Sequence, residues 1–502
     1  MIMNSTVELQ RLSVGTHHEI SEDFTLPDYL PEIRRIVSCT GTVLPESRYM
    51  DRGEIVLSGL AVGSVCYVGD DGKLCAFPVN SEYSARLSVA SHNTAELSAD
   101  AMTVRTCLDS ISCRATGPRQ LVLGFKMRSS VFASHNDALP FDISFSDGTE
   151  CSVANGMTLE KHVEAFEYTS ISNVTSAGSL AGAISEREGT RILSCEGAAV
   201  VNSASADSSE VTLTGDLFIS CLAEDADGVF YPIRIKESFR ETVRLKDGAG
   251  EYLRRYAVGH VRCTSVKMSG GDGGHFTWEA EYDADVSVLT EKEGTLTSDV
   301  YSTAFESEIQ RVKAPVVSCL AGVNSRLSVD SAKTVGALSG KEVVFVTSKV
   351  SRDRAECTAD GKLVLSGSCN VTAILADDDG ITSEELAIPF RYECECKRPT
   401  GMGTVIMWDA DVISADGRFD GEKLSVSCEL AFSALAMGTF DKSYVGRVLL
   451  RRDEPVGISG EVLKLYFPLE NETMWDIGKR YHCRLQSINE LESSSAVLIR
   501  SK

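Results

Sequence analysis

The sequence predicts a mainly β fold: three antiparallel sandwich-like or barrel-like repeats, followed by a small C-terminal α+β module. Three observations support this prediction. Short segments in which apolar and polar residues alternate, rich in β-branched side chains, are separated by Asp-Gly-type turns, which is the pattern of β-hairpins. One of these segments occurs three times along the chain. After Gly460 the alternation gives way to a short segment with the spacing of an amphipathic helix.

The repeated segment sets the length of each unit. Glu54-Ile-Val-Leu-Ser-Gly59 recurs as Glu210-Val-Thr-Leu-Thr-Gly215 and as Lys362-Leu-Val-Leu-Ser-Gly367, at intervals of 156 and 152 residues. In each copy an acidic turn with Gly follows, and then an alternating segment with an interior Pro, which favours an edge position because Pro cannot donate to a strand ladder. Three antiparallel β domains of about 150 residues each are therefore expected, since a sandwich or open barrel buries one face of so many short strands.

Domain boundaries are expected in stretches rich in Ser, Ala and Gly. The pattern leaves the order of the strands within a repeat open, and a small helix is expected near Glu251–Ala257. The expected parts are an N-terminal segment at 1–25, repeats at 26–170, 183–325 and 336–458, and the C-terminal module at 461–502.

Composition and charge restrict the class of protein. Of the 502 residues, 43% are hydrophobic and 24% are charged, the balance of a globular chain. The chain has 72 Asp and Glu against 49 Lys and Arg, a net charge of −23. Such an acidic surface disfavours nucleic acid and anionic lipid as ligands, because both bind basic patches.

We expect the protein to remain in the compartment that makes it. No stretch approaches the roughly 20 apolar residues that span a bilayer, and Met1–Glu19 lacks the apolar core of a secretory signal. The 16 Cys are too sparse in so long a chain for a secreted disulfide scaffold, so reduced and mostly buried thiols are expected.

The residues after Gly460 predict a strand, two short helices and a final strand. Thr473 is a suitable helix N-cap with Asp476 three residues on, close to a capping box. Met474, Ile477 and Tyr481 would then line one face of this helix. The other elements are expected at Glu461–Phe467 (strand), about Leu485–Leu491 (second helix) and Ala496–Ile499 (strand).

This module resembles the LysM domain. Glu472-Thr-Met-Trp-Asp-Ile-Gly-Lys-Arg-Tyr481, followed by Leu485 and Ile488-Asn489, is similar to the family core Asp-Thr-Leu-Trp-x-Ile-Ala-x-x-Tyr with its following Leu-Asn pair. The sequence departs from the pattern at Glu472, at Met474 and before the last strand. The resemblance implies a surface for a partner or ligand at Asn471, Thr473, Met474, Trp475, Asp476, Asn489 and Glu490.

Two of these residues have alternative roles. Trp475 is expected either in the core of the small module or at a partner-binding rim, because Trp is enriched among interface anchors. Asn489 is expected either to cap the second helix or to present its amide to a ligand.

The repeats carry a resemblance of their own. Leu26-Pro-Asp-Tyr-Leu-Pro-Glu-Ile-Arg-Arg-Ile36 is similar to the opening signature of SPOCS domains, with Glu32 in place of the second Asp. SPOCS repeats followed by one C-terminal LysM domain resemble the SipL-type spore-coat morphogenetic proteins of endospore-forming clostridia. That resemblance implies a non-enzymatic scaffold in the mother-cell cytoplasm, at the forespore and spore-coat surface. Its LysM domain would dock the basement-layer ATPase of the coat or other coat proteins. The alternative is a LysM protein that binds peptidoglycan or another polymer of N-acetylglucosamine.

The residues show no catalytic constellation, and no cofactor or metal is expected. The eight His are scattered without metal-ligand spacing. Cys394-Glu-Cys396 places two thiols on one face of a strand, in or near the core. Gly336–Lys341 is one residue too short for a phosphate-binding loop. The acidic turns are expected to be hairpin turns, since they lack the 12-residue loop and distal Glu of a Ca²⁺ site.

Overall fold

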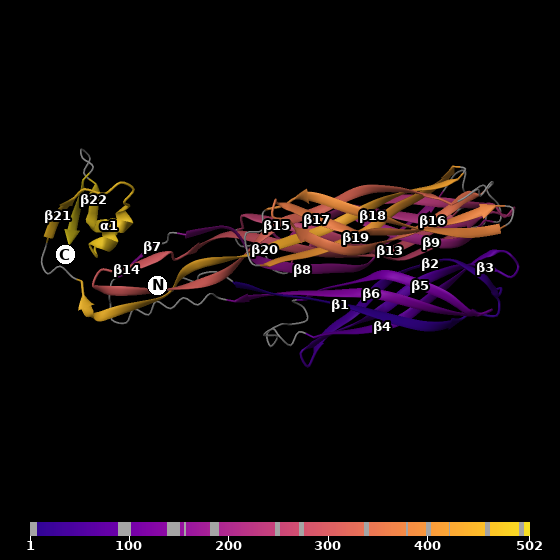
Figure 1. The fold of residues 1–502 in the computed structure, drawn as a ribbon, viewed down its shortest axis with the longest axis horizontal. Helices are drawn as coiled ribbons and strands as arrows, with labels where there is room; N and C mark the ends of the chain where they lie inside the picture. Colours follow the sequence, from indigo (N-terminus) through magenta and orange to yellow (C-terminus); the bar gives the residue numbers. More distant parts are fainter. Residues whose placement is uncertain are drawn as a thin grey trace.

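The protein is built almost entirely from β-strands. The computed structural model describes residues 8–88, 102–137, 151–154, 157–180, 190–245, 252–270, 276–335, 341–377, 380–397, 403–420, 422–456, 462–490 and 496–501. Strands make up 84% of the structure and helices 3%, which confirms the mainly β prediction with its repeated sheets and small C-terminal module. In Figure 1 the repeats pack side by side with their strands along the long axis, and the C-terminal module lies at one end.

Each repeat folds into a unit of two three-stranded antiparallel sheets. One sheet holds the repeated sequence segment in its central strand. The other contains the first strand of the unit and its last two strands, with the last strand in the centre. The first unit has sheets β2-β3-β4 and β1-β6-β5, formed by β1 (Glu8–Thr25), β2 (Ile33–Asp51), β3 (Glu54–Gly69), β4 (Leu74–Ser88), β5 (Met102–Gly117) and β6 (Gln120–Asp137).

The second and third units repeat this topology. The second unit has sheets β9-β10-β11 and β8-β13-β12, formed by β8 (Met157–Leu180), β9 (Arg191–Ala206), β10 (Glu210–Glu224), β11 (Phe230–Arg244), β12 (Arg254–Gly270) and β13 (Phe276–Leu296). The third unit has sheets β16-β17-β18 and β15-β20-β19, formed by β15 (Phe305–Thr334), β16 (Glu342–Cys357), β17 (Lys362–Asp377), β18 (Gly380–Glu395), β19 (Gly403–Asp420) and β20 (Lys423–Pro455).

The first strand of each unit lies earlier in the chain than the expected boundaries. β1 lies in the expected N-terminal segment 1–25 but pairs with β6. β8 begins within the expected repeat 26–170 but pairs with β13, and β15 begins within the expected repeat 183–325 but pairs with β20. Alternation identifies a strand but not the distant strand with which it pairs, so the boundaries could not follow from it.

A β-bulge recurs at the same place in all three units and turns one apolar side chain toward the other units. The pairing of the first two strands of the repeated sheet skips Val37, Leu193 and Val344. All three lie in one apolar cluster between the units, together with Leu222 and Ile374 from the central strands. Bulges re-aim side chains, and here the repeated bulge brings the three units together around a common centre.

A second apolar cluster joins the other sheets of the units. Phe132 of β6, Leu289 of β13 and Leu435 of β20 meet in it, and all three side chains are buried. Each unit also has its own core between its two sheets. The units therefore pack through two shared clusters and form one continuous body.

The Gly that ends the repeated segment is required by packing. At Gly215 a Cβ atom would lie 2.1 Å from the carbonyl oxygen of Val200 and 2.3 Å from the ring of Phe239. A carbonyl oxygen of the neighbouring strand and an aromatic ring face Gly59 and Gly367 in the same way. Only Gly leaves room for both neighbours, which explains why it occurs in every copy of the segment.

The first two acidic turns are hairpin turns, as expected. Gly72 and Gly228 have φ angles of 79° and 80°, a region that suits Gly. The Asp225 carboxylate accepts hydrogen bonds from the amides of Asp227 at 3.1 Å and Val229 at 2.9 Å. These carboxylates therefore shape the turn. Residues 378–379 of the third turn lie outside the described residues.

The predictions of two short helices are wrong. The residues Arg254–Ala257 begin strand β12, and Glu251 lies outside the described residues. In place of the second helix about Leu485–Leu491, a single 3₁₀ turn at Leu485–Ser487 leads into the short strand β22 (Ile488–Glu490). Pairing of β22 with the last strand satisfies its backbone groups, which a helix would have satisfied internally.

The prediction that all cysteines are reduced is wrong for one pair. Cys195 of β9 and Cys221 of β10 lie directly opposite each other and form a disulfide. Cys394 and Cys396 are half-buried against the core of the third unit, as expected. The phosphate-loop-like segment Gly336–Lys341 lies outside the described residues except for its last residue.

The C-terminal module contains β21 (Val462–Tyr466), α1 (Met474–Arg480), β22 and β23 (Val497–Ser501), with sheet order β21-β23-β22. Next to it in Figure 1 lies a small two-stranded sheet of β7 (Cys151–Ala154) and β14 (Asp299–Ser302). No helix in the described part of the chain is both long enough and apolar enough to cross a membrane.

Candidate functional site

Thr473 and Asp476 start helix α1 as a capping box. The Thr473 hydroxyl accepts a hydrogen bond from the Asp476 amide at 3.2 Å, and the Asp476 carboxylate accepts one from the Thr473 amide at 2.9 Å. Hydrogen bonds from the hydroxyl and the amide of Thr473 lower the pKa of Asp476. Both side chains are exposed, but each is already used to begin the helix.

The inner face of α1 is the one expected from its sequence. Ile477 is fully buried, and Met474 and Tyr481 pack against the same small core, which β22 and β23 complete. Met474, expected at a binding surface, is thus half-buried and contributes to the core of the module.

Trp475 contacts the body of the protein. Its indole N–H donates a hydrogen bond to the Asp299 carboxylate of β14 at 2.9 Å, and its ring meets that of Tyr301 edge-on with centroids 4.9 Å apart. Lys479, one turn along the helix, lies 2.7 Å from the same carboxylate. Partial burial alone would raise the pKa of Asp299, but hydrogen bonds from Lys479 and Trp475 hold it below its ordinary value. We call this set of four residues the docking contact.

Neighbouring groups extend the docking contact. The Tyr301 hydroxyl donates a hydrogen bond to the carbonyl oxygen of Cys483 at 2.6 Å. A Cβ at Gly478 would lie 2.5 Å from that hydroxyl, so the Gly inside the helix lets β14 approach. A ring nitrogen of His482 lies 3.1 Å from the carbonyl oxygen of Ser302. Trp475 therefore lies neither wholly in the core of the module nor free at a partner-binding rim. Its half-buried ring packs between the module and the body.

The other expected site residues remain on the surface. Asn471 is exposed in the loop before α1, with a φ angle of 67°. Asn489 and Glu490 are exposed on β22, opposite Leu498 and Val497 of β23. Asn489 lies in a strand and therefore caps no second helix.

An exposed apolar row on the C-terminal module was not anticipated from the sequence. Its members are alternate residues with large exposed fractions: Leu463 (65%), Leu465 (54%), Phe467 (61%) and Leu469 (65%). We call this row the terminal stripe. The period-two pattern predicts a strand, but it does not show that these apolar side chains would be left uncovered by the described part of the chain. Leu463 and Leu465 lie on β21 (Val462–Tyr466), and Phe467 and Leu469 follow it outside the strand. Exposed apolar patches often mark interaction sites.

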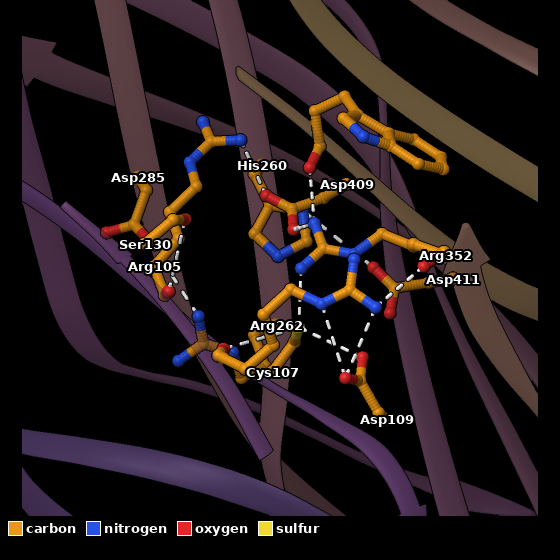
Figure 2. Close-up of polar contacts among 12 residues, drawn as sticks. Arg105, Cys107, Asp109, Ser130, His260, Arg262, Asp285, Arg352, Asp409 and Asp411 are labelled. Carbon is orange, nitrogen blue, oxygen red and sulfur yellow. Dashed lines mark hydrogen bonds and ion pairs between the residues drawn. The ribbon is translucent and has the colours of Figure 1, made fainter. Parts of the chain in front are cut away.

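The second site that sequence analysis missed is a group of charged residues where the three units meet. Figure 2 labels all of these side chains except that of Arg128 and shows them converging from strands of all three units. We call them the central ionic cluster: Arg105 and Asp109 from β5, Arg128 from β6, His260 and Arg262 from β12, Asp285 from β13, Arg352 from β16, and Asp409 and Asp411 from β19.

Asp409 is the centre of this cluster. Its carboxylate lies 2.5 Å from the Arg105 guanidinium and also pairs with the guanidinium of Arg352, and all three residues are buried. Burial by itself would raise the pKa of Asp409, but the surrounding charges, with Arg105 the largest contribution, hold it well below its ordinary value. Arg352 also donates to the carbonyl oxygen of Trp408. A buried, ionised carboxylate thus ties the first and third units together.

The remaining members pair at longer distances around Asp409. Arg128 lies 3.2 Å from Asp109, Arg262 lies 3.9 Å from Asp285, and His260 lies 3.8 Å from the half-exposed Asp411. The first two of these pairs lie within single units, whereas His260 and Asp411 belong to the second and third units. Together with the pair of Arg105 and Asp409, this contact links the units to one another.

A cavity of about 1020 Å³ adjoins the central ionic cluster. Strands of all three units line it, and the lining includes the exposed Glu385 and Ala387, so it reaches solvent. Glu196 and Lys349 also face it. Burial raises the pKa of Glu196 to about 7, against the opposing effects of a hydrogen bond from Thr40 and the charge of Lys349. One carboxylate oxygen of Glu196 has no hydrogen-bond partner among the described residues.

The sequence holds one signal for this cluster. In the β5–β6 and β19–β20 hairpins, Arg105 and Asp409 occupy matching register positions, opposite Ser130 and Ser433. Opposite charges at equivalent positions of two repeats could have suggested a contact between units. The contact itself joins residues 304 positions apart and depends on how the units pack.

Comparisons with protein-family models, with curated proteins and with solved structures found no match for this chain. Among the described residues, no group of three or more His, Cys, Asp or Glu side chains is arranged to hold a metal ion.

Proposed function

We propose that this protein is a non-enzymatic scaffold of spore-coat or spore-envelope assembly in the mother cell. In this proposal its C-terminal module docks coat proteins, foremost the basement-layer ATPase, at the forespore surface. The observation on which the proposal rests most is the terminal stripe, an exposed apolar row on a module at one end of the molecule. The SPOCS-like opening and the LysM-like core support the assignment to coat assembly.

The body supports a scaffold role because its units are fixed to one another. Two shared apolar clusters and the central ionic cluster join all three units. A body of this kind holds bound partners at constant separations, which an assembly platform requires. Its acidic surface favours specific docking over general adhesion to anionic membranes.

A binding assay with the purified coat ATPase tests the proposal. Leu465→Ser with Phe467→Ser should weaken capture by about 30-fold or more, since loss of even one central interface anchor costs about 2 kcal/mol or more. Leu253→Ser is the matched control, because Leu253 is a similarly exposed Leu on the body, at 47%. Circular dichroism must show both variants folded. Equal capture by the stripe variant and the wild type would refute docking through this module.

A fluorescent fusion followed through sporulation tests the location. A shell of signal around the forespore is expected for the wild type. Diffuse signal throughout the mother cell would contradict the scaffold.

Binding to peptidoglycan is the second candidate. The exposed polar side chains of Asn471, Asn489 and Glu490 favour it, because amide and carboxylate groups can recognise sugar hydroxyls. The engagement of Trp475 with β14 weighs against it, since that ring is already packed. Co-sedimentation with purified peptidoglycan, lost in Asn489→Ala and retained in the stripe variant, would reverse the order of the two candidates.

A further inference from the structure

Cysteine pairs occur inside each of the three units. In the second unit, Cys195 and Cys221 form a disulfide. In the first unit, Cys39 and Cys113 hydrogen-bond to each other through their thiols. The third unit has a thiol pair of the same kind, which is described below. Only the second-unit pair is joined, so the other pairs are candidates for oxidation.

The first-unit pair lies between the two sheets of its unit. Cys39 is on β2, an edge of one sheet, and Cys113 is on β5, an edge of the other. Both pack against the first unit's core as half-buried residues. A bond between them would therefore add a covalent link between two sheets that otherwise meet by packing and by hydrogen bonds such as the one from Ser81 to Glu22.

The same pair is open to small molecules. Cys39 and Cys113 both line the cavity of about 1020 Å³ between the units, and this cavity reaches solvent. An oxidant the size of hydrogen peroxide that enters the cavity therefore comes next to both residues without unfolding of the unit.

We propose that Cys39 and Cys113 form a peroxide-responsive dithiol, which oxidises to a disulfide and locks the two sheets of the first unit together. The Cys113 thiolate attacks one oxygen of hydrogen peroxide, the O–O bond breaks, and hydroxide leaves to become water on protonation. This step oxidises Cys113 to a sulfenic acid. The sulfur of Cys39 then attacks the sulfenic sulfur, the S–O bond breaks and a second water leaves. Two thiols and one peroxide thus become one disulfide and two waters.

The order of the two steps follows from the hydrogen bond. Cys39 donates its S–H to the sulfur of Cys113, which raises the pKa of Cys39 and lowers that of Cys113. Cys113 is therefore the better source of thiolate and the first to be oxidised. Cys39 is held in contact with it and serves as the resolving thiol.

The third unit supplies an internal control. Cys369 of β17 and Cys428 of β20 share the same thiol–thiol hydrogen bond. Both are buried, with exposed fractions of 0% and 1%, and both lie within the core of the third unit. Neither lines the cavity. The two pairs therefore share the pairing of thiols and differ in access to an oxidant.

Peptide mapping by mass spectrometry tests the proposal. Full-length protein is reduced, freed of reductant, exposed to graded hydrogen peroxide, alkylated and digested without reduction. The Cys39–Cys113 disulfide should form at least about tenfold faster than a Cys369–Cys428 disulfide, because reactivity follows thiolate character and exposure. In Cys39→Ser, a sulfenic-acid probe should label Cys113. In Cys113→Ser, labelling of Cys39 should be much weaker.

Three results would overturn the proposal. One is a Cys39–Cys113 pair that stays reduced while peroxide oxidises other cysteines. Another is formation of the two disulfides at equal rates in the folded protein, since access would then have no role. The third is unlabelled Cys113 in a folded Cys39→Ser variant. If Cys39→Ser does not fold, Cys39→Ala takes its place. In denaturant both pairs should react at similar rates, which calibrates the folded-state difference.

Discussion

The indole N–H of Trp475 donates a hydrogen bond to the carboxylate of Asp299, 176 residues earlier in the chain, at 2.9 Å. This bond fastens the C-terminal module to the strand that follows the second unit. The same carboxylate pairs with Lys479, so one acidic residue receives two donors from one face of α1. The aromatic residue that the sequence marks as a partner-binding candidate is thus held first by the protein itself.

Asp299→Ala should release the module from β14. The expected loss is about 1–2 kcal/mol of docking free energy, because hydrogen bonds to charged groups contribute about that much and this site is partly open to water. Trp475 should become more accessible to acrylamide quenching, with a red-shifted emission. Glu470→Ala is the control, since Glu470 is exposed on the same module. Unchanged quenching in Asp299→Ala would contradict the docking contact.

The docking contact should also weaken in acid. The pKa of Asp299 is depressed in the folded protein, so its contribution is present above the ordinary value of 3.8 and is lost as pH falls through the folded pKa. Quenching of Trp475 should therefore rise below about pH 4 in the wild type and change little in Asp299→Ala. An identical acid profile in both proteins would assign the transition to other groups.

Gly215→Ala should destabilise the second unit. The added methyl would lie 2.1 Å from a backbone oxygen and 2.3 Å from the Phe239 ring, and backbone cannot easily yield. A cost of about 1–3 kcal/mol is expected from overpacking of this kind, measured by chemical or thermal unfolding. Gly403→Ala is the matched control, because no atom lies within 4 Å of the Cβ built there. Equal effects of the two substitutions would exclude the packing explanation.

Asp409→Asn should loosen the junction between the units. The substitution removes the charge that pairs with the buried Arg105 and Arg352. Breaking one side of a buried ion pair costs about 3–5 kcal/mol, because the remaining charges stay desolvated. Asp411→Asn should cost less than about 1 kcal/mol, since that side chain is half-exposed. Denaturant unfolding measures both, and a small effect of Asp409→Asn would show that the cluster does not hold the units.

Glu196→Gln should change the pH dependence of stability. The pKa of Glu196 is raised to about 7, so the wild type is most stable where this residue is protonated in both states, below 4.5. That contribution is lost as pH rises through 7, by about 3 kcal/mol in total. The variant should therefore gain stability relative to the wild type as pH rises from about 4.5 to about 7. Glu237→Gln, at an exposed position, should leave the profile unchanged. Parallel profiles for all three proteins would contradict the raised pKa.

Several features could be predicted because they depend on near neighbours in the chain. The helix start at Thr473 follows from a hydrogen-bonding partner three residues away, and the hairpin turns follow from Asp and Gly in adjacent positions. The second short helix could not be excluded in this way. Ile488 pairs with Ile499 in a strand, and this pairing lies beyond the range of a local pattern.

The candidate site was only partly predictable for the same reason. Asn471, Asn489 and Glu490 are exposed, but Met474 packs inward and Trp475 binds Asp299. The terminal stripe has the pattern of an ordinary strand. It is a candidate interaction site only because none of the described residues covers its apolar side chains.

By itself, the sequence determined that the protein is mainly β, that its body has three related units, and that the repeated segment of each unit ends in Gly. Only the tertiary structure decided which strands close each unit, how Asp409 binds two arginines, and where Trp475 packs. The physical reason is how far apart in the sequence the contacting residues lie. Alternation, turns and caps are set by residues a few positions apart, whereas the buried charge of Asp409 pairs with residues 57 and 304 positions away, and the closing strand of each unit is similarly distant. Those contacts form only when the whole chain has folded.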